Sequence, residues 1–424
     1  MPYYYDVIVV GAGAAGLLAA GRAAECGAKV LLLEKMNRPG RKLTITGNGR
    51  CNITNTAQLG EFIKHIGPDS KFVRPSFSKF FSKDIVNLLE NNGVPTVVED
   101  EEFVFTKSCK AIDVVNALVK WNKDLKVEII CNSNIIEVVK KDNHIEYVVT
   151  DNDLKYYAKS LIVTCGGASY PATGSSGDGY KWFKSLGHKV TPIRPALVPL
   201  ETKGNTAQQL QGLSLPKTKI VVWVDGKKKI ERVGDMLFTH FGITGPLVHS
   251  LSRHIIEDLQ KGKNIVFAFD LLSDIPECEI DGYLLNQLLI HGKKLFSNFI
   301  SLYLPPKLIP ICIAAIGVLP DKISNHISAV ERKRLRLWLK EFKIEISGSR
   351  SFAEAMVTSG GVSLEEVDAK TMQSKIIENL YIAGEILDLD ADTGGYNLQI
   401  AFSTGYVAGE SAAKYVISKK PLSL

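Results

Sequence analysis

The chain has 424 residues, of which 45% are hydrophobic and 23% charged, and its formal net charge is +6. This composition is that of a folded protein with a large core and two or three domains, so it excludes a disordered chain. The mild positive charge suits small anionic ligands. We expect no nucleic-acid partner, because a protein that binds nucleic acid would show more strongly clustered charge.

The seven cysteines form no CxxC pair and no zinc-finger spacing. We therefore expect free thiols in a reducing compartment and no metal site. The first strand begins so close to the N-terminus that it leaves no room for a signal peptide, and the longest apolar stretch, 308–319, is interrupted by Pro310 and too short to span a bilayer. These features predict a cytoplasmic protein without a membrane partner, and they leave the oligomeric state open.

The chain opens with a pattern typical of a dinucleotide-binding turn. Residues 7–10 predict a buried parallel strand, and a helix is predicted over 15–26. Between them, Gly11 permits a tight turn, Gly13 lets the backbone approach a pyrophosphate, and Gly16 lets the helix pack on the strand. The phosphates would meet the free backbone amides at the N-terminus of the helix. Ala14 and Ala15 are therefore also candidate cofactor contacts.

A second predicted strand, 29–33, ends in Glu34, eighteen residues beyond Gly16. A carboxylate at this place accepts hydrogen bonds from ribose hydroxyls and repels a 2′-phosphate. The ligand of this site is therefore expected to be FAD or NAD rather than NADP. The neighbouring Lys35 is a further candidate contact.

The segment 40–55 combines glycines with many hydrogen-bond donors. Such a loop can follow FAD from its pyrophosphate to its isoalloxazine ring, whereas the alternative is a solvated basic turn. Flavin disulfide reductases need a second cysteine four or five residues from the first, and Cys51 has none. We therefore expect Cys51 to pack or to contact the cofactor by its backbone. The candidate cofactor contacts here are Arg41, Lys42, Thr46, Gly47, Asn48, Gly49, Arg50, Cys51 and Asn52.

Helices are predicted over 82–91 and 111–123, followed by a strand over 160–164. Open α/β sheets bind ligands where their strands end, so the residues after this strand are candidates. The Tyr170 phenol could donate to a substrate or to the flavin, although packing against Pro171 explains it equally well. The candidate cofactor contacts in this part are Ile135, Thr164, Cys165, Gly166, Gly167 and Tyr170.

From 191 to 350 the pattern changes to short strands, such as 219–224 and 264–269, and amphipathic helices near 281–304 and 324–342. His240 could relay protons near the flavin, although a structural hydrogen bond is the simpler interpretation. The basic run 331–343 predicts a helix that packs one apolar face while its cations stay in water, with an acidic partner or RNA as the alternative. Those cations are Arg332, Lys333, Arg336 and Lys340.

Flavin-binding character returns after residue 350. An apolar strand over 380–383 leads into paired glycines and a small-residue-rich helix over 397–415, whose N-terminus would suit the N1–C2=O edge of a reduced flavin. This second glycine turn favours FAD over NAD. The candidate contacts are Gly384, Glu385, Gly394, Gly395, Tyr396, Asn397, Leu398 and Gln399.

These patterns predict an α/β protein. A Rossmann-like FAD-binding domain, built from residues 1–190 and 351–424, is interrupted by an α+β insert, 191–350, which would cover the substrate. The FAD is expected to be bound non-covalently.

Five blocks of the chain resemble one known family. They are the glycine turn at 11–16, the loop at 40–55, Gly-Gly-Ala-Ser-Tyr-Pro-Ala-Thr-Gly from 166, Leu-Phe-Thr-His-Phe-Gly-Ile-Thr-Gly-Pro at 237–246, and the region 356–409. Over essentially its whole length the chain resembles the BaiN/YhiN-like family of bacterial NAD(P)/FAD-dependent oxidoreductases. Some members are described as aminoacetone oxidases or as reductases of conjugated bile-acid enones. Glu385 departs from the aspartate that broader flavoprotein families carry after that glycine.

No second GxGxxG unit occurs, so no dedicated NAD(P)H domain is expected. Nicotinamide could instead visit the flavin cleft as a transient donor. Aided by the resemblance, the leading hypothesis is NAD(P)H-dependent reduction of an activated C=C bond in a small molecule. The alternatives are an amine oxidase that releases hydrogen peroxide and a flavin-binding protein that modifies or senses RNA. The catalytic acid or base stays unassigned, with Tyr170 and His240 as candidates.

Overall fold

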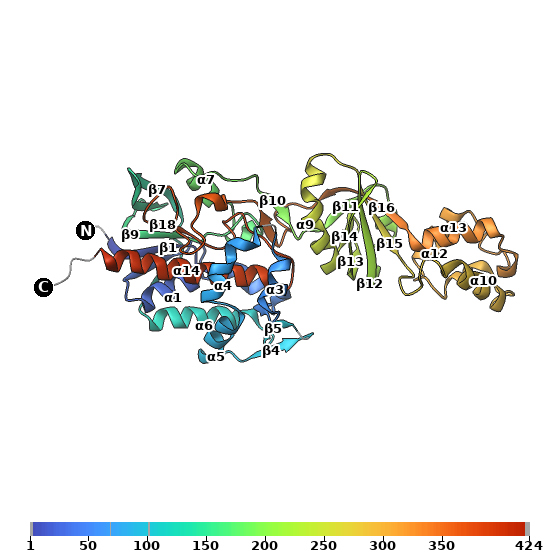
Figure 1. The fold of residues 1–424 in the computed structure, drawn as a ribbon, viewed down its shortest axis with the longest axis horizontal. Helices are drawn as coiled ribbons and strands as arrows, with labels where there is room; N and C mark the ends of the chain where they lie inside the picture. The colour runs from blue at the N-terminus through green and yellow to red at the C-terminus, as the bar shows by residue number, and fades with distance from the viewer. Residues whose placement is uncertain (1–2, 68, 101, 420–424) are drawn as a thin grey trace. The chain divides into compact units, whose positions relative to one another are not determined.

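A computed structural model describes residues 3–67, 69–100 and 102–419, and these form two compact units (Figure 1). Unit 1 comprises Met1–Pro195 and Phe352–Leu424, and unit 2 comprises Ala196–Ser351. The boundaries predicted from the sequence lie within five residues of these. Unit 1 is therefore assembled from two segments that are far apart in the chain.

Unit 1 is built on a seven-stranded sheet with the order β6-β2-β1-β9-β8-β7, and β18 also pairs with β9. Five strands are parallel, and β7 and β8 form an antiparallel extension. The carboxyl ends of the parallel strands therefore share one edge, as in doubly wound folds. The strands are β1 (Tyr3–Val10), β2 (Val30–Leu33), β6 (Glu128–Ile130), β7 (Ile135–Lys141), β8 (His144–Thr150), β9 (Lys155–Val163) and β18 (Leu380–Ile382).

Two helices, α1 (Ala14–Glu25) and α14 (Tyr396–Ser418), pack directly on each other beside this sheet (Figure 1). Their backbones approach so closely that a Cβ on Gly405 would lie 2.2 Å from the carbonyl oxygen of Ala15. A Cβ on Gly409 would lie equally close to the carbonyl oxygen of Ala19. The small residues of the last helix are therefore a packing requirement.

The remaining helices and strands of unit 1 surround the sheet and line its loops. The predicted helix over 82–91 agrees with the observed one, and the predicted helix over 111–123 ends one residue later. These elements are α2 (Arg41–Ile45), α3 (Leu59–Phe62), α4 (Arg74–Lys79), α5 (Ser82–Asn91), α6 (Ala111–Asp124), α7 (Asp178–Ser185), β3 (Thr54–Asn55), β4 (Thr96–Glu99), β5 (Phe103–Thr106) and β17 (Val357–Ser359), with β10 (Arg194–Ala196) at the unit boundary.

Unit 2 contains a closed barrel in the order β11-β14-β13-β12-β15-β16. The sequence predicted strands here but not their closure, because pairing between distant strands leaves no local signal. The strands are β11 (Leu200–Thr202), β12 (Ser214–Val224), β13 (Lys227–Phe238), β14 (Gly242–Thr244), β15 (Ile265–Asp270) and β16 (Phe342–Ser349). The helices are α8 (Thr206–Gln209), α9 (Pro246–Gln260), α10 (Ile280–Ile290), α11 (Phe296–Ile300), α12 (Leu308–Ile316) and α13 (Ala329–Lys340).

Two helix predictions in unit 2 were wrong. The segment 281–304 is not one helix, because α10 ends at Ile290 and a turn precedes α11. The helix predicted over 324–342 begins only at Ala329, where Ser328 forms a capping box with Glu331.

The Lys340 ammonium is also not in water as predicted. It is 8% exposed, lies 2.7 Å from an Asp270 carboxylate oxygen, and donates to the carbonyl oxygens of Leu272 and Ile275. The Arg332 side chain is likewise only 16% exposed, and its guanidinium donates to both carboxylate oxygens of Asp281. Two of the four cations predicted to stay in water are therefore structural.

His249 in α9 gives unit 2 a pH-dependent stability. Burial lowers its pKa to about 4, and its Nε2 lies 3.0 Å from the Thr244 hydroxyl. An unfolded chain protonates this imidazole near pH 6.5, before the folded chain does, so stability is fully present above that pH and is lost as the pH falls towards 4. The free energy of unfolding decreases by at most about 3 kcal/mol.

We expect the unfolding midpoint in urea to decrease between pH 6.5 and pH 4, and to decrease less in His249→Gln. An unchanged pH profile in that variant would contradict this assignment.

Candidate flavin site

The glycine turn after β1 has the geometry of a phosphate cradle. Gly11 has a φ of +98°, and a Cβ on Gly16 would lie 1.8 Å from the Gly11 carbonyl oxygen, so α1 packs directly on the turn. A Cβ on Gly13 would meet nothing within 4 Å. The protein itself therefore does not require glycine at Gly13, whereas a ligand that approaches its backbone does. No side chain caps the start of α1 within the described chain, which leaves its first amides available to an anion.

Glu34 lies at the end of β2, beside this turn. Its two carboxylate oxygens accept hydrogen bonds from the backbone N–H groups of Ala12 and Met36, both at 2.8 Å. Burial raises the pKa of Glu34, and these two N–H groups oppose that shift. The backbone thus fixes the carboxylate in place, while each oxygen keeps a second lone pair for a ribose hydroxyl.

The loop after Gly40 is held against the same turn. The Gly40 N–H donates to the Ala12 carbonyl oxygen at 2.8 Å. Four residues of the loop then have left-handed backbone conformations: Gly47, Asn48, Gly49 and Cys51. The side-chain oxygen of Asn52 is buried and has no hydrogen-bond partner among the described residues. Such an unsatisfied amide group in a glycine-rich loop fits a ligand that completes its hydrogen bonding.

Cys51 is buried within this loop, and burial raises its pKa to about 12. The thiolate is the reactive form, so its fraction at pH 8 is about one in ten thousand. We expect iodoacetamide at pH 8 to label the exposed Cys109 and Cys278 while Cys51 stays unmodified in the folded protein. Peptide mass spectrometry measures the labelling of each cysteine, and a urea-unfolded sample is the control in which Cys51 reacts. Labelling of folded Cys51 at the rate of Cys278 would show that the thiol is activated.

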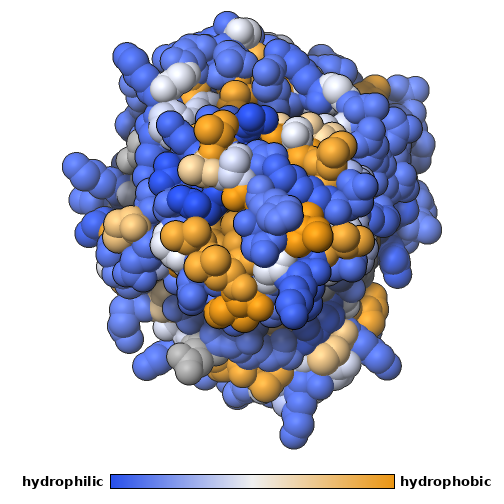
Figure 2. Space-filling view, turned by 90° about the vertical axis from the view of Figure 1, so that its right-hand side faces the viewer, coloured by the Kyte–Doolittle hydropathy of each residue, from blue (hydrophilic) through white to orange (hydrophobic). Residues whose placement is uncertain are grey.

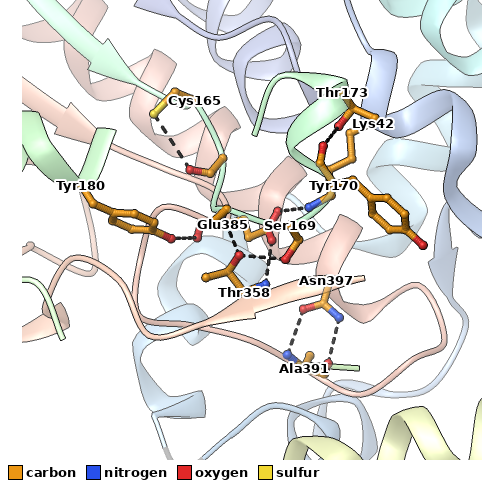
Figure 3. A network of polar contacts seen from close by, with 12 residues as sticks. Lys42, Cys165, Ser169, Tyr170, Thr173, Tyr180, Thr358, Glu385, Ala391 and Asn397 are labelled. Atoms are coloured by element: carbon orange, nitrogen blue, oxygen red, sulfur yellow. Dashed lines mark hydrogen bonds and ion pairs between the residues drawn. The ribbon is translucent and has the colours of Figure 1, made fainter. Parts of the chain in front are cut away.

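Glu385, which follows β18, connects helix α2 and strand β17 at the carboxyl edge of the sheet (Figure 3). One carboxylate oxygen accepts from the Thr358 N–H at 2.8 Å, and the other lies 2.6 Å from the Lys42 ammonium. The Thr358 hydroxyl in turn accepts from the Ala168 N–H at 2.8 Å and lies 2.9 Å from the Ser169 hydroxyl. The carboxylate is therefore the centre of a network, and both of its oxygens already have a protein partner.

Tyr170 follows this network in an unusual backbone conformation. Its φ of +52° is left-handed, which costs energy for a residue with a side chain. Its N–H donates to the Phe352 carbonyl oxygen, and its own carbonyl oxygen accepts from the Thr173 hydroxyl. The ring points away from the network in Figure 3, and its phenol has no hydrogen-bond partner in the part of the chain that the structure describes. Tyr170 is therefore held by its backbone and has a free phenol.

The second glycine turn precedes α14. Gly394 and Gly395 have φ values of +130° and +87°, and a Cβ on Gly395 would lie 2.5 Å from the backbone of Thr54. The Asn397 side chain accepts from the Ala391 N–H and donates to the Ala391 carbonyl oxygen (Figure 3). This side chain closes the preceding loop, so only the backbone of Asn397 is left for a cofactor.

A family model described as "HI0933-like protein Rossmann domain" matches residues 5–411. The chain belongs to this family. The HI0933-like family comprises FAD-dependent oxidoreductases, so the chain is an enzyme of that class.

Curated relatives extend over almost the whole chain. A 3-dehydro-bile acid delta(4,6)-reductase from Clostridium scindens is 29% identical over 408 residues, which cover 96% of this chain and 98% of that protein. A ribosomal RNA dihydrouridine synthase from Haemophilus influenzae is 29% identical over 418 residues, covering 98% and 100%. Its namesake from Escherichia coli is 26% identical over 407 residues, covering 96% and 97%.

Solved structures agree with the family's fold. The open conformation of a flavocytochrome c3 fumarate reductase superimposes with a TM-score of 0.53 at 18% identity, over 98% of this chain and 79% of that one. Mycobacterium smegmatis Sdh1 gives a TM-score of 0.52 at 15% identity, over 99% and 70%. These similarities confirm the predicted Rossmann-type architecture.

The site of this HI0933-like protein fits FAD. Uncapped amides at the start of α1 suit the pyrophosphate, Glu34 suits the adenosine ribose, and the unsatisfied Asn52 lies in the loop that would reach the flavin. Thr164, at the end of β9, supports this arrangement because its hydroxyl lies 2.9 Å from the Gly11 carbonyl oxygen. Four segments predicted to contact the cofactor, which begin at residues 11, 34, 164 and 384, thus lie together at the ends of the strands.

Several predicted contacts in this family member have other partners in the structure. Lys35 lies 2.9 Å from Asp178, Arg50 pairs with Glu99, and Gln399 bonds Thr54 and Ser403. Tyr396 is buried and stacks on His65. Their roles as cofactor contacts stay predictions, as do those of Ala14, Ala15, Arg41, Thr46, Gly49, Ile135, Cys165, Gly166, Gly167 and Leu398.

His240 belongs to unit 2, where its ring lies 5.1 Å from that of Phe241, and its proposed relay stays a prediction. Sequence reasoning missed Thr358, which organises the Glu385 network. The Val-Thr-Ser-Gly-Gly-Val stretch that contains it was a visible signal in this HI0933-like chain. Within the described residues, no helix is long and apolar enough to cross a membrane.

Proposed function

We propose that this enzyme reduces a C=C bond conjugated to a carbonyl group, with NAD(P)H as the electron donor. The observation that carries the proposal is that relatives with different names share one type of reaction. A delta(4,6)-reductase saturates a conjugated double bond, and formation of dihydrouridine from uridine saturates the C5=C6 bond of uracil, which is also conjugated to a carbonyl. Overall, NAD(P)H and a proton reduce C=C to CH–CH and leave NAD(P)⁺.

A bound FAD supplies hydride transfer through its N5 atom. The protein's own residues then have three tasks. The α1 amides would hold the pyrophosphate and Glu34 the adenosine ribose, while the Glu385 network keeps Lys42 of α2 and Thr358 of β17 in a fixed arrangement. Tyr170 is our candidate to donate the proton that the substrate carbon needs, because its phenol is free and its backbone is fixed.

The test is an anaerobic titration of the purified protein with NADH or NADPH, followed by a conjugated enone. We expect the flavin band near 450 nm to bleach with the nicotinamide and to return when the enone is added, with one enone reduced per nicotinamide oxidised. A band that returns only with oxygen, together with peroxide release from a small amine, would favour the amine oxidase instead. Tyr170→Phe is expected to lower the reoxidation rate by the enone about 10²-fold while bleaching is unchanged.

A second candidate substrate is uridine within RNA. The names of two relatives suggest it, and the distribution of charge supports it. Residues 196–351 contain 21 Lys and Arg against 15 Asp and Glu, so the whole net charge of +6 lies in unit 2. Conversion of uridine to dihydrouridine in ribosomal RNA, measured by mass spectrometry of nucleosides, distinguishes this substrate from a small enone.

A further inference from the structure

The helical part of unit 2, residues 280–340, has a surface that the reductase chemistry does not use. It contains nine Lys and Arg against Asp281, Asp321 and Glu331, so this part of unit 2 is basic. It also contains nine of the exposed large hydrophobic side chains in the described structure. Figure 2 faces the helical part of unit 2 and shows orange side chains interspersed with blue ones. A surface that is both basic and apolar requires an explanation.

Five of the aliphatic side chains lie on adjoining segments. Leu295 and Ile323 form a β-bridge, and the Phe296 N–H donates to the Lys322 carbonyl oxygen. The Asn325 N–H donates to the Gly292 carbonyl oxygen, which brings the end of α10 beside the same segment. We call this surface the aliphatic tip. It comprises Leu289, Ile290, Leu295, Leu319 and Ile323, with Leu289, Ile290 and Leu319 each more than 60% exposed.

Cations surround the aliphatic tip. Lys293 and Lys294 are exposed between α10 and α11, and neither forms an ion pair with a described residue. Lys322 pairs with Glu331, and His326 is exposed in the segment that follows. Asp321 is the only acidic side chain within these adjoining segments, 289–297 and 319–326. The chemistry of the tip therefore suits a partner that carries negative charge and also offers apolar surface.

We propose that the aliphatic tip and its lysines bind folded RNA. The lysines would neutralise phosphates, and the aliphatic side chains would insert between bases, as Leu and Ile wedges do in proteins that unstack a duplex. A uridine in folded RNA must leave its stack before a flavin enzyme can reduce it, and a protein that loosens base stacking when it binds RNA favours that change. This inference rests on the RNA candidate of the proposed function.

Other occupants fit the tip less well. A second copy of the chain related by a twofold axis would bring Lys293 and Lys294 of both copies together, and like charges repel. An anionic membrane surface shares the required chemistry, but the exposed tip contains no Trp, Tyr or Phe, which interfacial segments favour. Folded RNA uses both the charge and the aliphatic side chains.

The test compares variants of the full-length holoenzyme for binding to purified ribosomal RNA at several salt concentrations. Lys293→Glu/Lys294→Glu is expected to weaken binding about tenfold at 0.1 M salt and to lower the salt dependence by about two counterions. Leu289→Ser/Leu319→Ser is expected to keep that salt dependence, but to lose the fluorescence increase that the wild type gives with an RNA stem-loop containing 2-aminopurine in its stem. The matched control is Lys83→Glu/Lys107→Glu, which reverses two exposed lysines of unit 1 and is expected to bind like the wild type.

Two results would overturn the proposal. One is equal RNA binding by the Lys293/Lys294 variant and the control, and the other is binding of wild type to phosphatidylglycerol vesicles but not to RNA. Flavin bleaching by NAD(P)H and enone reduction are measured on each variant. If these fail in the wild type while the lysine variant still loses RNA affinity, the reductase proposal fails and the RNA surface stands. If bleaching and enone reduction succeed while RNA binding is absent, the reductase proposal stands and the RNA surface fails.

Discussion

Gly405→Ala is expected to destabilise the protein and to lower its FAD content. The added Cβ would lie 2.2 Å from the Ala15 carbonyl oxygen, and a backbone atom cannot move away by a side-chain rotation. The helices α1 and α14 must therefore separate, at a cost of about 3 kcal/mol, the upper range for overpacking. Ala15 lies in the first turn of α1, whose amides would face the phosphates, so the displacement also distorts the proposed cofactor cradle.

The matched comparison for this variant is Gly409→Ala. Its Cβ would lie 2.2 Å from the Ala19 carbonyl oxygen, one turn farther from the start of α1. Thermal unfolding of the apoprotein is expected to be lowered by similar amounts in both variants, whereas the FAD dissociation constant rises more in Gly405→Ala. Gly60→Ala, at a helical glycine with open space around it, controls for the substitution itself. Equal FAD affinity in the two packing variants would show that the start of α1 does not hold the cofactor.

The sequence was sufficient for those parts of the fold that have a local pattern. The glycine turn, Glu34 and the strand ends were predicted because each needs a specific residue type at a fixed spacing, and the structure brings them together. Helix α5 was predicted at its observed bounds, since it has a clear amphipathic period and a capping aspartate, Asp84.

The missed features depend on contacts between distant segments. Closure of the barrel in unit 2 pairs β11 with β16, which are separated by more than a hundred residues. The burial of Lys340 follows from the carbonyl groups of Leu272 and Ile275, and no periodicity of the basic run contains that information. In the same way, the Asn397 side chain was a candidate flavin contact until the fold showed it bonded to Ala391.

Glu385 is the residue at which substitution tests the site most directly. Its side chain and that of Lys42 are each 21% exposed, so the pair is largely withdrawn from water. Glu385→Ala leaves both the Lys42 ammonium and the Thr358 N–H without a partner. Removing one member of a buried pair typically costs about 3 kcal/mol, and the segments that Glu385 connects, α2 and β17, also belong to the proposed flavin cradle. We therefore expect a lower unfolding midpoint and FAD affinity reduced by about 100-fold or more.

A double-mutant cycle separates the pair from general damage. Lys42→Ala, Glu385→Ala and the double variant are expected to give a coupling energy of about 2–3 kcal/mol for unfolding, because the double variant leaves no uncompensated charge. The same cycle at Lys64 and Glu61, whose side chains are more than 60% exposed, is expected to give less than about 1 kcal/mol. Glu385→Asp is expected to lie between wild type and Glu385→Ala, because the shorter side chain cannot reach Lys42 and Thr358 together without movement of a loop. If the two cycles give equal coupling energies, Glu385 does not hold α2 and β17 together, and its carboxylate would then be free for the ribityl chain of the flavin.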